Sequence, residues 1–459
     1  MKIQVQISHT KNIDIHVGYA AMKIAHISDT HLGRRPKQTR SEIVNQEVRP
    51  LEDDFYSAWI KFVNEIVDKS RDRPDIILHC GDFFDTPAGY DPNPPPEYAR
   101  KVAALTFKQL YDANIPVIII DGNHGRYMEY RSSTLAVFPV AFDNIHLFTH
   151  YDATDSLRTQ QPLFIDIDNL NLRVITHPSI ESRALSTLDI QSVYKNWIQL
   201  LNNSISSDLI NIAMAHGMIE NSTLHKDFLR GSYQYIALGD DHKMRKVTDH
   251  AWYSGSTELW NFSEINNEKG YLMVELEQGN ASPRITTKKI QSSRRIILDT
   301  IEIFPEDTNH QIIKRVTNNF DAHGLNMRYE YSTAARVKII LKGNKTYGSS
   351  FNIGEIESAL RRLALDSNDY NIVEFILDRP DYPEYTKQEN IDQSLIDNIE
   401  FLIEDPQKEF KEYVTVMRNK DLEKQNLDPN LLAKIFAKVI NRSSEKTNDT
   451  SSMIERGNN

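Results

Sequence analysis

The sequence predicts an α/β protein in which short buried strands alternate with helices. Five apolar runs rich in isoleucine and valine lie in the first 240 residues, at 23–28, 75–80, 116–120, 209–215 and 235–238. Their nearly continuous apolarity is typical of strands that are covered on both faces. Apolar side chains spaced three and four residues apart predict a helix over 51–69, and a second helix is expected over 97–113. This alternation favours an α/β sandwich flanked by helices.

The composition is that of a folded protein with more than one domain. The chain has 459 residues, of which 40% are hydrophobic and 25% charged. Its length predicts two or three domains. A single cysteine, Cys80, excludes an internal disulfide framework and fits a reducing compartment, and its place in an apolar run predicts burial. No run approaches the ~20 apolar residues that a membrane span requires, so we expect no membrane association.

The two ends of the chain differ from its middle. Residues 1–21 lack the basic start and apolar block of a secretory signal. Met22 directly precedes the first predicted strand and is a second candidate for the native start, which would leave 1–21 as an N-terminal extension. At the other end, residues 443–459 are polar, and we expect a disordered tail there.

Three further segments follow the first five runs. Alternating residues in 251–290 predict strands that complete a first domain over 22–290. A strand–helix–strand–helix–strand pattern then predicts a small α+β domain over 291–380. Beyond it, Asp405-Pro406 and Asp428-Pro429 are helix-start signals, so we expect a helical segment over 381–442.

Each of the five apolar runs ends in a polar cluster. These clusters are Asp29-Thr30-His31, Gly81-Asp82, Gly122-Asn123-His124, His216-Gly217 and Gly239-Asp240-Asp241-His242. Ligands of α/β sheets gather beyond the carboxyl ends of the strands, so we expect these side chains to share one crevice. Their oxygen and imidazole donors, without thiolate, suit manganese, iron or zinc. Asp29 and His31 would point the same way in extended chain, and Asp82, after a glycine, would be free to bridge two ions.

The motifs taken singly have ordinary structural explanations. Gly-Asp and Gly-Asn-His are common turn sequences, and a lone histidine such as His216 is more often a hydrogen-bonded core residue than a ligand. All five in order, each at a strand end, favour a metal centre. We expect the remaining histidines, such as His26, His79 and His177, to be structural.

This ordered set resembles the calcineurin-like metallophosphoesterases. The motifs here are DTH (29–31), GDFFD (81–85), GNHG (122–125), His216 and GDDH (239–242). The flanking stretches ISDTHLG, HCGDFFDTP and PVIIIDGNH look like the nuclease subunit of double-strand-break repair complexes, the SbcD or Mre-eleven type. The resemblance is strong over 22–290. It implies a two-sheet metallophosphoesterase sandwich, followed by a capping domain and an ATPase-binding helical segment that match in order and size only.

The resemblance also implies roles for individual residues. One metal ion would be held by Asp29, His31, His242 and the shared Asp82, and a second by Asp82, Asn123, His216 and Asp240. His124 would lie near the scissile phosphate as the catalytic residue. Asp85 and Asp241 would lie behind the ligands or against the substrate. The expected cofactor is a pair of manganese ions, with iron, magnesium or zinc as alternatives.

Three positions depart from the family pattern. Asp240 stands where the family usually has histidine, and this additional carboxylate favours harder ions such as manganese. Gly125 replaces an acidic residue and so removes an expected partner of His124. Asp85 occupies a position that is histidine in some relatives, and a carboxylate there cannot stabilise an anion as imidazolium would.

The expected function is manganese-dependent exonuclease and endonuclease cleavage of DNA at double-strand breaks. The resemblance implies an SMC-like coiled-coil ATPase of the SbcC type bound through 391–442, a homodimer, and a prokaryotic cytoplasm close to the nucleoid. A net charge of −11 is unusual for a DNA-binding chain, so DNA contacts would come from local basic clusters, the metals or the partner. The helix over 428–442 could instead dock onto its own domain. Two other functions stay open: a phosphodiesterase or phosphatase for small nucleotides, and a catalytically weak scaffold for DNA ends.

Overall fold

The computed structural model describes residues 21–378, with gaps at 37, 41–47, 70, 72, 86–93, 125, 128–131, 181–187, 221–222, 278–281, 291–293 and 344–350. The chain divides into two compact units, 1–380 and 381–459, and all described residues belong to the first unit. The N-terminal extension up to residue 20, Gly125, the helical segment over 381–442 and the tail over 443–459 therefore lie outside the described residues.

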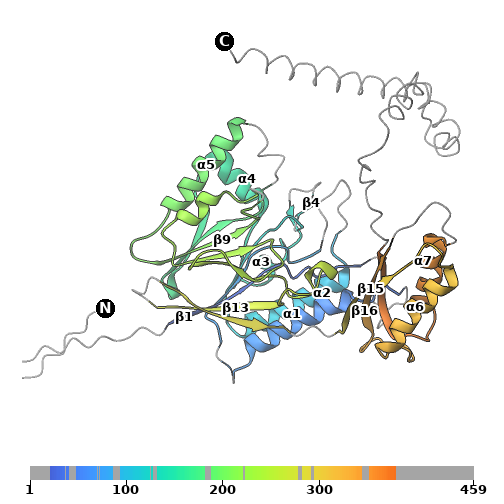
Figure 1. Ribbon diagram of the computed structural model, residues 1–459. Coiled ribbons are helices and arrows are strands. Elements are labelled where there is room, and N and C mark those ends of the chain that lie inside the picture. Colours follow the sequence, from blue (N-terminus) through green and yellow to red (C-terminus); the bar gives the residue numbers. More distant parts are fainter. Residues whose placement is uncertain are drawn as a thin grey trace, which may run out of the picture. The chain divides into compact units, whose positions relative to one another are not determined.

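Two six-stranded sheets form the centre of the fold (Figure 1). The first has the order β14-β13-β1-β2-β3-β6 and consists of Arg284–Lys289, Gly270–Leu276, Met22–Ile27, Ile76–His79, Val117–Ile120 and Ile145–Phe148. The second has the order β11-β12-β10-β9-β8-β7 and consists of Arg245–Lys246, Ala251–Tyr253, Tyr235–Gly239, Ile210–His216, Leu172–His177 and Phe164–Ile167. The inner strands of each sheet are parallel. Antiparallel strands form both edges of the second sheet and one edge of the first, whose other edge strand, β6, is parallel to β3.

Alternation along the strands explains why the five runs are apolar throughout. Ile24, Ile76 and Ile118 face the second sheet and share a core with Ile212 and Met214. The residues between them, such as Ala25, Ile77 and Val117, belong to a different core beneath helices. Because successive side chains point to opposite faces, strands covered on both sides need apolar residues at every position. The α/β sandwich predicted from the sequence is therefore confirmed.

Helices cover the outer faces of both sheets. Helices α1 (Glu52–Val67) and α2 (Glu97–Asp112) pack on the first sheet, and α4 (His150–Thr159) and α5 (Leu188–Asn203) pack on the second. The sequence pattern indicated no element between residues 121 and 208, where the structure has β6, α4, β7, β8 and α5. The remaining short elements are β4 (Arg126–Tyr127), β5 (Ser132–Ser133), α3 (Phe138–Ala141), η1 (Asp168–Leu170), η2 (Lys226–Arg230) and η3 (Phe262–Glu264).

A smaller parallel sheet follows in the chain, here called the capping sheet. Its strands β15 (Ile296–Glu302), β16 (Ala335–Lys342) and β17 (Ile372–Asp378) have the order β15-β16-β17. Helices α6 (Asn309–Ala322) and α7 (Ile353–Arg361), the latter continued by a π turn (Arg362–Asp366), share an apolar core with these strands. The order of strands and helices is the one predicted over 291–380.

Buried arginines join the capping sheet to the sandwich. Arg40 donates from Nε to the Ile372 carbonyl at 2.7 Å, and its Nη2 reaches three more carbonyls after α7. Arg336 pairs with Glu374 at 2.6 Å within the capping sheet and donates to the Leu259 carbonyl at 2.9 Å. Thus the loop after β1 and the segment before η3 are both held by the capping sheet.

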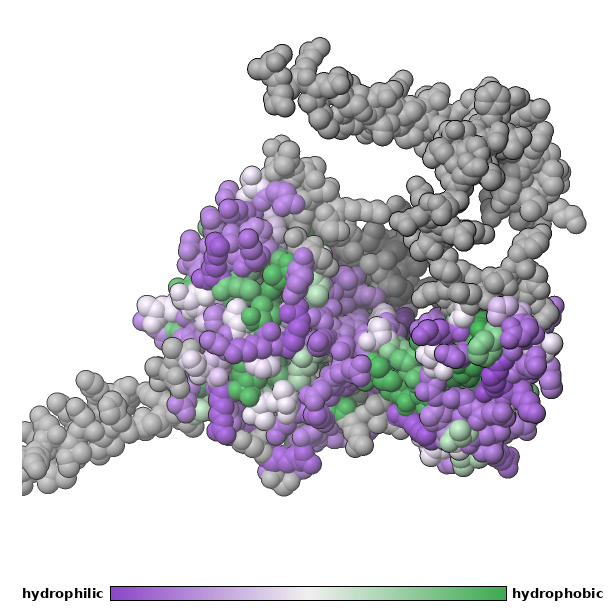
Figure 2. Space-filling model, viewed as in Figure 1, coloured by the Kyte–Doolittle hydropathy of each residue, from purple (hydrophilic) through white to green (hydrophobic). Residues whose placement is uncertain are grey.

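The surface of the described residues is mostly polar. Figure 2 shows that the described surface in view is mostly hydrophilic, with the apolar residues gathered in smaller areas. Among the described residues, no helix combines the length and apolarity needed to cross a bilayer.

Replacing Arg336 should destabilise the fold. In Arg336→Met, the carboxylate of Glu374, 4% exposed, would be left buried without its partner. We expect a loss of about 3–5 kcal/mol in the free energy of unfolding, measured by chemical denaturation. The double variant Arg336→Met/Glu374→Leu should recover most of this loss, and Arg328→Met, at an exposed arginine, should lose little. Unchanged stability of Arg336→Met would contradict this account of the junction.

Candidate metal centre

The carboxyl ends of strands from both sheets meet at one place. The loop after β1 is bonded to the loop after β2, with the Asp29 amide donating to the Gly81 carbonyl at 3.0 Å and the His31 amide to the Asp82 carbonyl at 3.0 Å. In the second sheet, His216 is the register partner of Gly239. Residues from all five polar clusters of the sequence therefore lie close together in one group, here called the crevice.

The backbone at this place is strained. Asp29, His31, Asp82 and Asp240 all have positive φ values, of 53°, 46°, 52° and 94°. The expectation that Asp29 and His31 lie in extended chain was wrong, because β1 ends at Ile27 and the loop curls back to bond with the neighbouring loop. Non-glycine residues held in this region are uncommon and cluster at functional sites. Four of them in one crevice indicate a site rather than a set of ordinary turns.

Two glycines allow the loops to approach closely. A Cβ atom at Gly122 would lie 2.0 Å from Oδ1 of Asp82, and one at Gly81 would lie 2.2 Å from Nδ1 of His216. No side chain fits at either position without moving a neighbour that faces the crevice. These glycines are needed for the packing of the site as well as for the turns they begin.

Asp82 lies at the centre of the cluster. Its Oδ2 is 3.8 Å from Nε2 of His31 and 3.6 Å from Nε2 of His216. Its Oδ1 accepts a hydrogen bond from the His124 amide at 2.9 Å. One carboxylate oxygen therefore faces two histidines that belong to different groups of candidate ligands.

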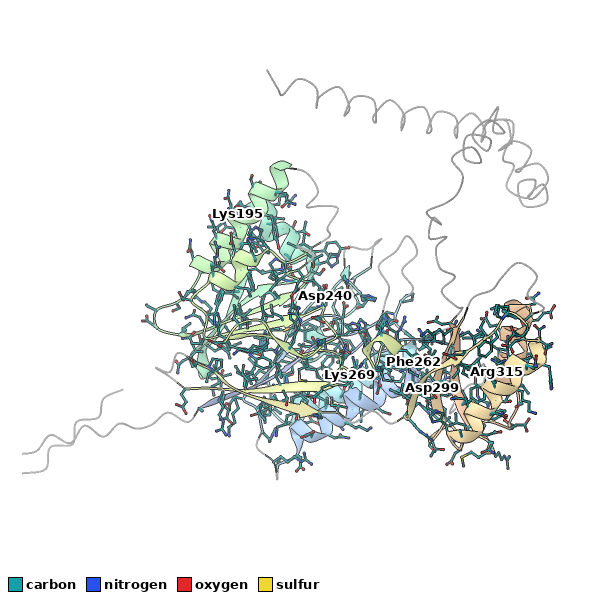
Figure 3. All side chains as sticks on the ribbon, viewed as in Figure 1. Lys195, Asp240, Phe262, Lys269, Asp299 and Arg315 are labelled. Carbon is teal, nitrogen blue, oxygen red and sulfur yellow. The ribbon has the colours of Figure 1, made fainter. Side chains whose placement is uncertain are left out.

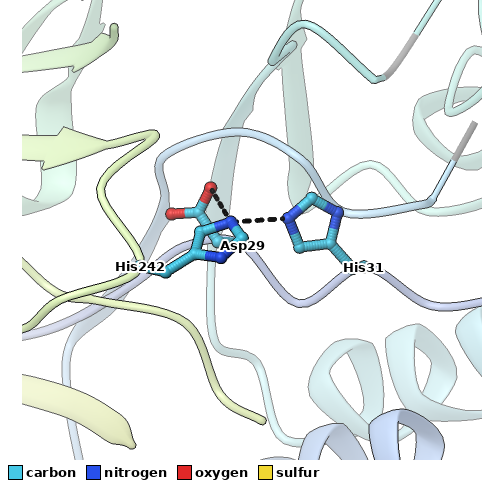
Figure 4. Close-up of side chains that lie close together, drawn as sticks. All are labelled: Asp29, His31 and His242. Atoms are coloured by element: carbon cyan, nitrogen blue, oxygen red, sulfur yellow. Dashed lines mark hydrogen bonds and ion pairs between the residues drawn. The ribbon is translucent and has the colours of Figure 1, made fainter. Parts of the chain in front are cut away.

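The first group consists of Asp29, His31 and His242, whose ligand atoms lie within 4.8 Å of one another (Figure 4). Nε2 of His31 and Nε2 of His242 are 3.1 Å apart, and Nε2 of His242 is 4.0 Å from Oδ1 of Asp29. The Nδ1 atom of His242 is 2.7 Å from Oε1 of Glu264. Since a carboxylate can only accept, His242 carries its proton on Nδ1, and Nε2 presents a lone pair to the group.

The second group surrounds His216. Nδ1 of His216 donates to the Cys80 carbonyl at 2.8 Å, which leaves Nε2 as the acceptor of the neutral ring, the form that binds a metal ion. That Nε2 is 3.6 Å from Oδ1 of Asp240, labelled in Figure 3, as well as 3.6 Å from Asp82. Nε2 of His216 and Oδ1 of Asn123 are buried without a hydrogen-bond partner among the described residues.

These unpaired atoms fit a bound cation. A buried polar atom without a partner is costly, and two acceptors in one crevice are explained if they face a metal ion. The donor set of carboxylate, imidazole and amide oxygen suits manganese, iron or zinc. The residues present in both groups therefore fit the metal pair expected from the sequence.

The charges of the crevice also favour a cation. Burial raises the pKa of Asp29 to about 6, although nearby histidines oppose this. Burial alone would lower the pKa of His216, but the surrounding carboxylates of Asp82, Asp240 and Asp29 outweigh it and raise the pKa to about 9. The crevice thus concentrates negative charge that a divalent ion would balance.

His124 has a partner that the sequence did not indicate. Gly125, expected to deprive His124 of its neighbour, lies outside the described residues, but Oδ1 of Asp85 is 3.0 Å from Nδ1 of His124. Burial lowers the pKa of His124, yet Asp82 and Asp85 outweigh it and raise the pKa overall. Asp85 therefore orients the imidazole. Asp85, His124 and His31 form a third group of candidate ligands, whereas Asp241 pairs with Arg245 at 2.5 Å and belongs to none of these groups.

Other residues of the crevice were missed by the sequence analysis. The Trp260 ring lies 4.2 Å from the His31 ring and 5.2 Å from the His242 ring, measured between centroids. Glu264 bonds to His242 and, at 2.7 Å, to the buried Lys269, also labelled in Figure 3. These residues follow no ligand spacing, so their only signal was their place in the stretch after β12.

The comparisons with known proteins agree with this geometry. A family model described as calcineurin-like phosphoesterase matches residues 22–244. Residues 22–244 are therefore similar to calcineurin-like phosphoesterases. This family binds divalent metal ions, and three groups of side chains lie close enough together to hold them: Asp29, His31 and His242; Asp29, Asp82 and His216; and His31, Asp85 and His124.

One curated relative points to a narrower group within the calcineurin-like phosphoesterases. It is a protein of Staphylococcus epidermidis, named as a subunit of the nuclease SbcCD, and it is 26% identical over 282 residues. The match covers 56% of this chain and spans 66% of the relative's length. The suspected SbcD-type resemblance is therefore supported.

The chain also has a weak likeness to solved structures. A crystal structure of TT1561 of Thermus thermophilus has a TM-score of 0.33 at 11% identity, and a second crystal structure has 0.35 at 12%. Each match covers 58% of this chain and 99% of the chain in the solved structure. Scores of this size support no inference about function.

Removing the partner of His242 should weaken metal binding. Without Glu264, the imidazole loses the acceptor that holds Nδ1, and Lys269 loses its charge partner. We expect Glu264→Ala to bind one manganese ion about 10- to 100-fold more weakly in a metal titration, and Glu264→Gln to show a smaller loss. Glu268→Ala, at an exposed glutamate paired with Lys289, serves as the control and should bind normally. Full manganese affinity of Glu264→Ala would show that this contact does not support the site.

Proposed function

We propose that this chain is a two-metal phosphodiesterase that cuts DNA at double-strand breaks, as a manganese-dependent exonuclease and endonuclease. The observation that carries the proposal is the position of Asp82 between two groups of ligands. One oxygen of its carboxylate is 3.8 Å from His31 and 3.6 Å from His216, which suits a carboxylate that bridges two ions. Two-metal sites of this kind are typical of enzymes that hydrolyse phosphoesters.

The proposed ligands divide between the two groups. Asp29, His31 and His242 would hold one ion, Asn123, His216 and Asp240 the other, with Asp82 shared. When bound, the pair of ions would polarise the phosphodiester and lower the pKa of a water molecule to give hydroxide near neutral pH. The carboxylate of Asp240 favours manganese over zinc, with iron and magnesium as further alternatives.

His124 would act on the leaving group. Its Nδ1 is held by Asp85, and its amide is held by Asp82, so both the ring and the backbone of this residue are fixed beside the metal ligands. A fixed imidazole that is not itself a ligand can donate a hydrogen bond to the departing oxygen and stabilise its charge.

The choice of DNA as substrate is supported by the similarity to a protein named as a nuclease subunit. The net charge of −11 means that the chain itself offers little general attraction for a polyanion. We therefore propose that an SMC-like coiled-coil ATPase, bound through 391–442, supplies part of the DNA affinity. We further propose a homodimer that works beside the nucleoid of a prokaryotic cell.

Asp82→Ala should lose both metal ions and all nuclease activity. The expected loss is complete because the variant removes the only ligand proposed for both ions. Metal content and cleavage of linear duplex and hairpin DNA, with bis-p-nitrophenyl phosphate as the small substrate, measure the two effects. Asp112→Ala, at an exposed aspartate on α2, is the matched control and should behave as wild type. Manganese-dependent cleavage retained by Asp82→Ala would refute the assignment, whereas wild-type cleavage of the small substrate but never of DNA would favour a small-nucleotide enzyme.

Binding of the ATPase should depend on the C-terminal segment. A chain truncated after residue 390 should fail to bring down an SbcC-type ATPase in a pull-down, because the proposed docking helices are removed. The same truncated chain should keep its manganese content and its activity on bis-p-nitrophenyl phosphate, which controls for folding. Undiminished pull-down would place the ATPase contact elsewhere in the chain.

A further inference from the structure

Arg34 lies at the edge of the metal centre, three residues after His31. Its guanidinium carbon is 3.8 Å from the centroid of the Trp260 ring, and its Nη1 is 3.5 Å from Oδ2 of Asp85. Its side chain keeps 27% of its surface exposed, while its Nε is buried without a hydrogen-bond partner among the described residues. The guanidinium is thus held in place while part of its hydrogen-bonding capacity stays unused.

Asp85 places this guanidinium beside His124. The two oxygens of the carboxylate are divided, with Oδ1 at 3.0 Å from Nδ1 of His124 and Oδ2 facing Arg34. Trp260 contacts the same two side chains, with its ring 5.6 Å from that of His124 between centroids. Arg34 and His124 are therefore neighbours on one side of the ligand cluster, joined by an acid and an aromatic ring.

The segment that carries Trp260 is itself well supported. The Trp260 amide donates to Oε2 of Glu264 at 3.0 Å, and the carbonyl of Leu259 accepts from Arg336 of the capping sheet. A guanidinium stacked on a ring that is fixed in this way loses little freedom when it binds an anion. This distinguishes Arg34 from the mobile arginines of an ordinary surface.

The crevice needs a cation at this position. Four carboxylates face or border the crevice, those of Asp29, Asp82, Asp85 and Asp240. The phosphodiester proposed as substrate is also an anion. Metal ions held by the two proposed groups would balance the carboxylates that bind them. Asp85 is not a proposed ligand of either ion, although it forms a third candidate group with His31 and His124. A guanidinium beside Asp85 both neutralises that carboxylate and offers planar donors that match phosphate oxygens.

We propose that Arg34 binds a non-bridging oxygen of the substrate phosphate at the metal centre, next to His124. This inference rests on the proposed phosphodiesterase function and names a residue that recognises the substrate. The simpler alternative is that Arg34 only neutralises Asp85 and packs on Trp260. If Arg34 binds the substrate, replacing it weakens phosphate binding and leaves the metal content unchanged. If it only neutralises Asp85, phosphate binding does not depend on it.

The test compares Arg34→Gln, Arg34→Lys and the control Arg158→Gln in the full manganese-loaded chain. Arg158 is 75% exposed on α4 and pairs with Asp155, so its replacement removes one positive charge away from the crevice. Inorganic phosphate is the probe, its dissociation constant is measured by calorimetry, and the manganese content of each variant is determined in parallel. Thermal melting confirms that each variant is folded.

We expect Arg34→Gln to bind phosphate about 10- to 100-fold more weakly with unchanged manganese content, as is typical when a charged hydrogen bond is lost. Arg34→Lys, which keeps the charge, should lose less, and Arg158→Gln should match wild type. With bis-p-nitrophenyl phosphate, Arg34→Gln should raise KM more than it lowers kcat, because the contact forms in the ground state.

Three results would overturn the inference. Arg34→Gln could bind phosphate as tightly as Arg158→Gln, it could lose manganese, or wild type could fail to bind phosphate at all. The proposed function can fail separately. If phosphate binding depends on Arg34 but wild type cuts no phosphoester, the inference about Arg34 stands and the enzymatic function is refuted.

Discussion

The carboxylate of Asp82 can reach two groups of ligands only because loops from three neighbouring strands approach one another closely. The loop after β2 is bonded to the loop after β1, and Gly122 of the loop after β3 lies where any Cβ would collide with Oδ1 of Asp82. The left-handed backbone of Asp29, His31 and Asp82 follows from this crowding. The sandwich, with strands buried on both faces, provides the rigid support on which such strain can persist.

Histidine orientation is the second constraint, and it comes from groups behind the ligands. His216 is held through Nδ1 by the Cys80 carbonyl, His242 by Glu264, and His124 by Asp85. In the neutral form of each ring the proton lies on Nδ1 and is donated to an acceptor, which leaves Nε2 for a metal ion or a substrate. The capping sheet contributes to this support, because Arg336 binds the carbonyl next to Trp260, and Trp260 packs against the ligand histidines. Arg336, Leu259 and Trp260 therefore link the capping sheet to the metal centre.

Much of this arrangement could be predicted from the sequence, and the parts that could not have physical reasons. Continuous apolar runs indicated the five strands, and the candidate ligands follow these runs directly in the sequence. Strand β7 gave no such signal because it is an edge strand with an exposed Phe164 and alternating exposure. The roles of Glu264 and Arg336 could not be predicted because their partners, His242 and Leu259, lie 22 and 77 residues away in the sequence, beyond any local spacing rule. The curled loop at Asp29 and His31 was missed because it depends on hydrogen bonds to a neighbouring loop rather than on its own residues.

The central claim is that Asp82 bridges two metal ions, and electron paramagnetic resonance of the manganese-loaded protein tests it most directly. The claim predicts two manganese ions per chain and the spectrum of an exchange-coupled pair, since ions that share a carboxylate lie ~3.5–4 Å apart. A single bound ion per chain, or two ions that give only the spectrum of isolated manganese, would contradict it.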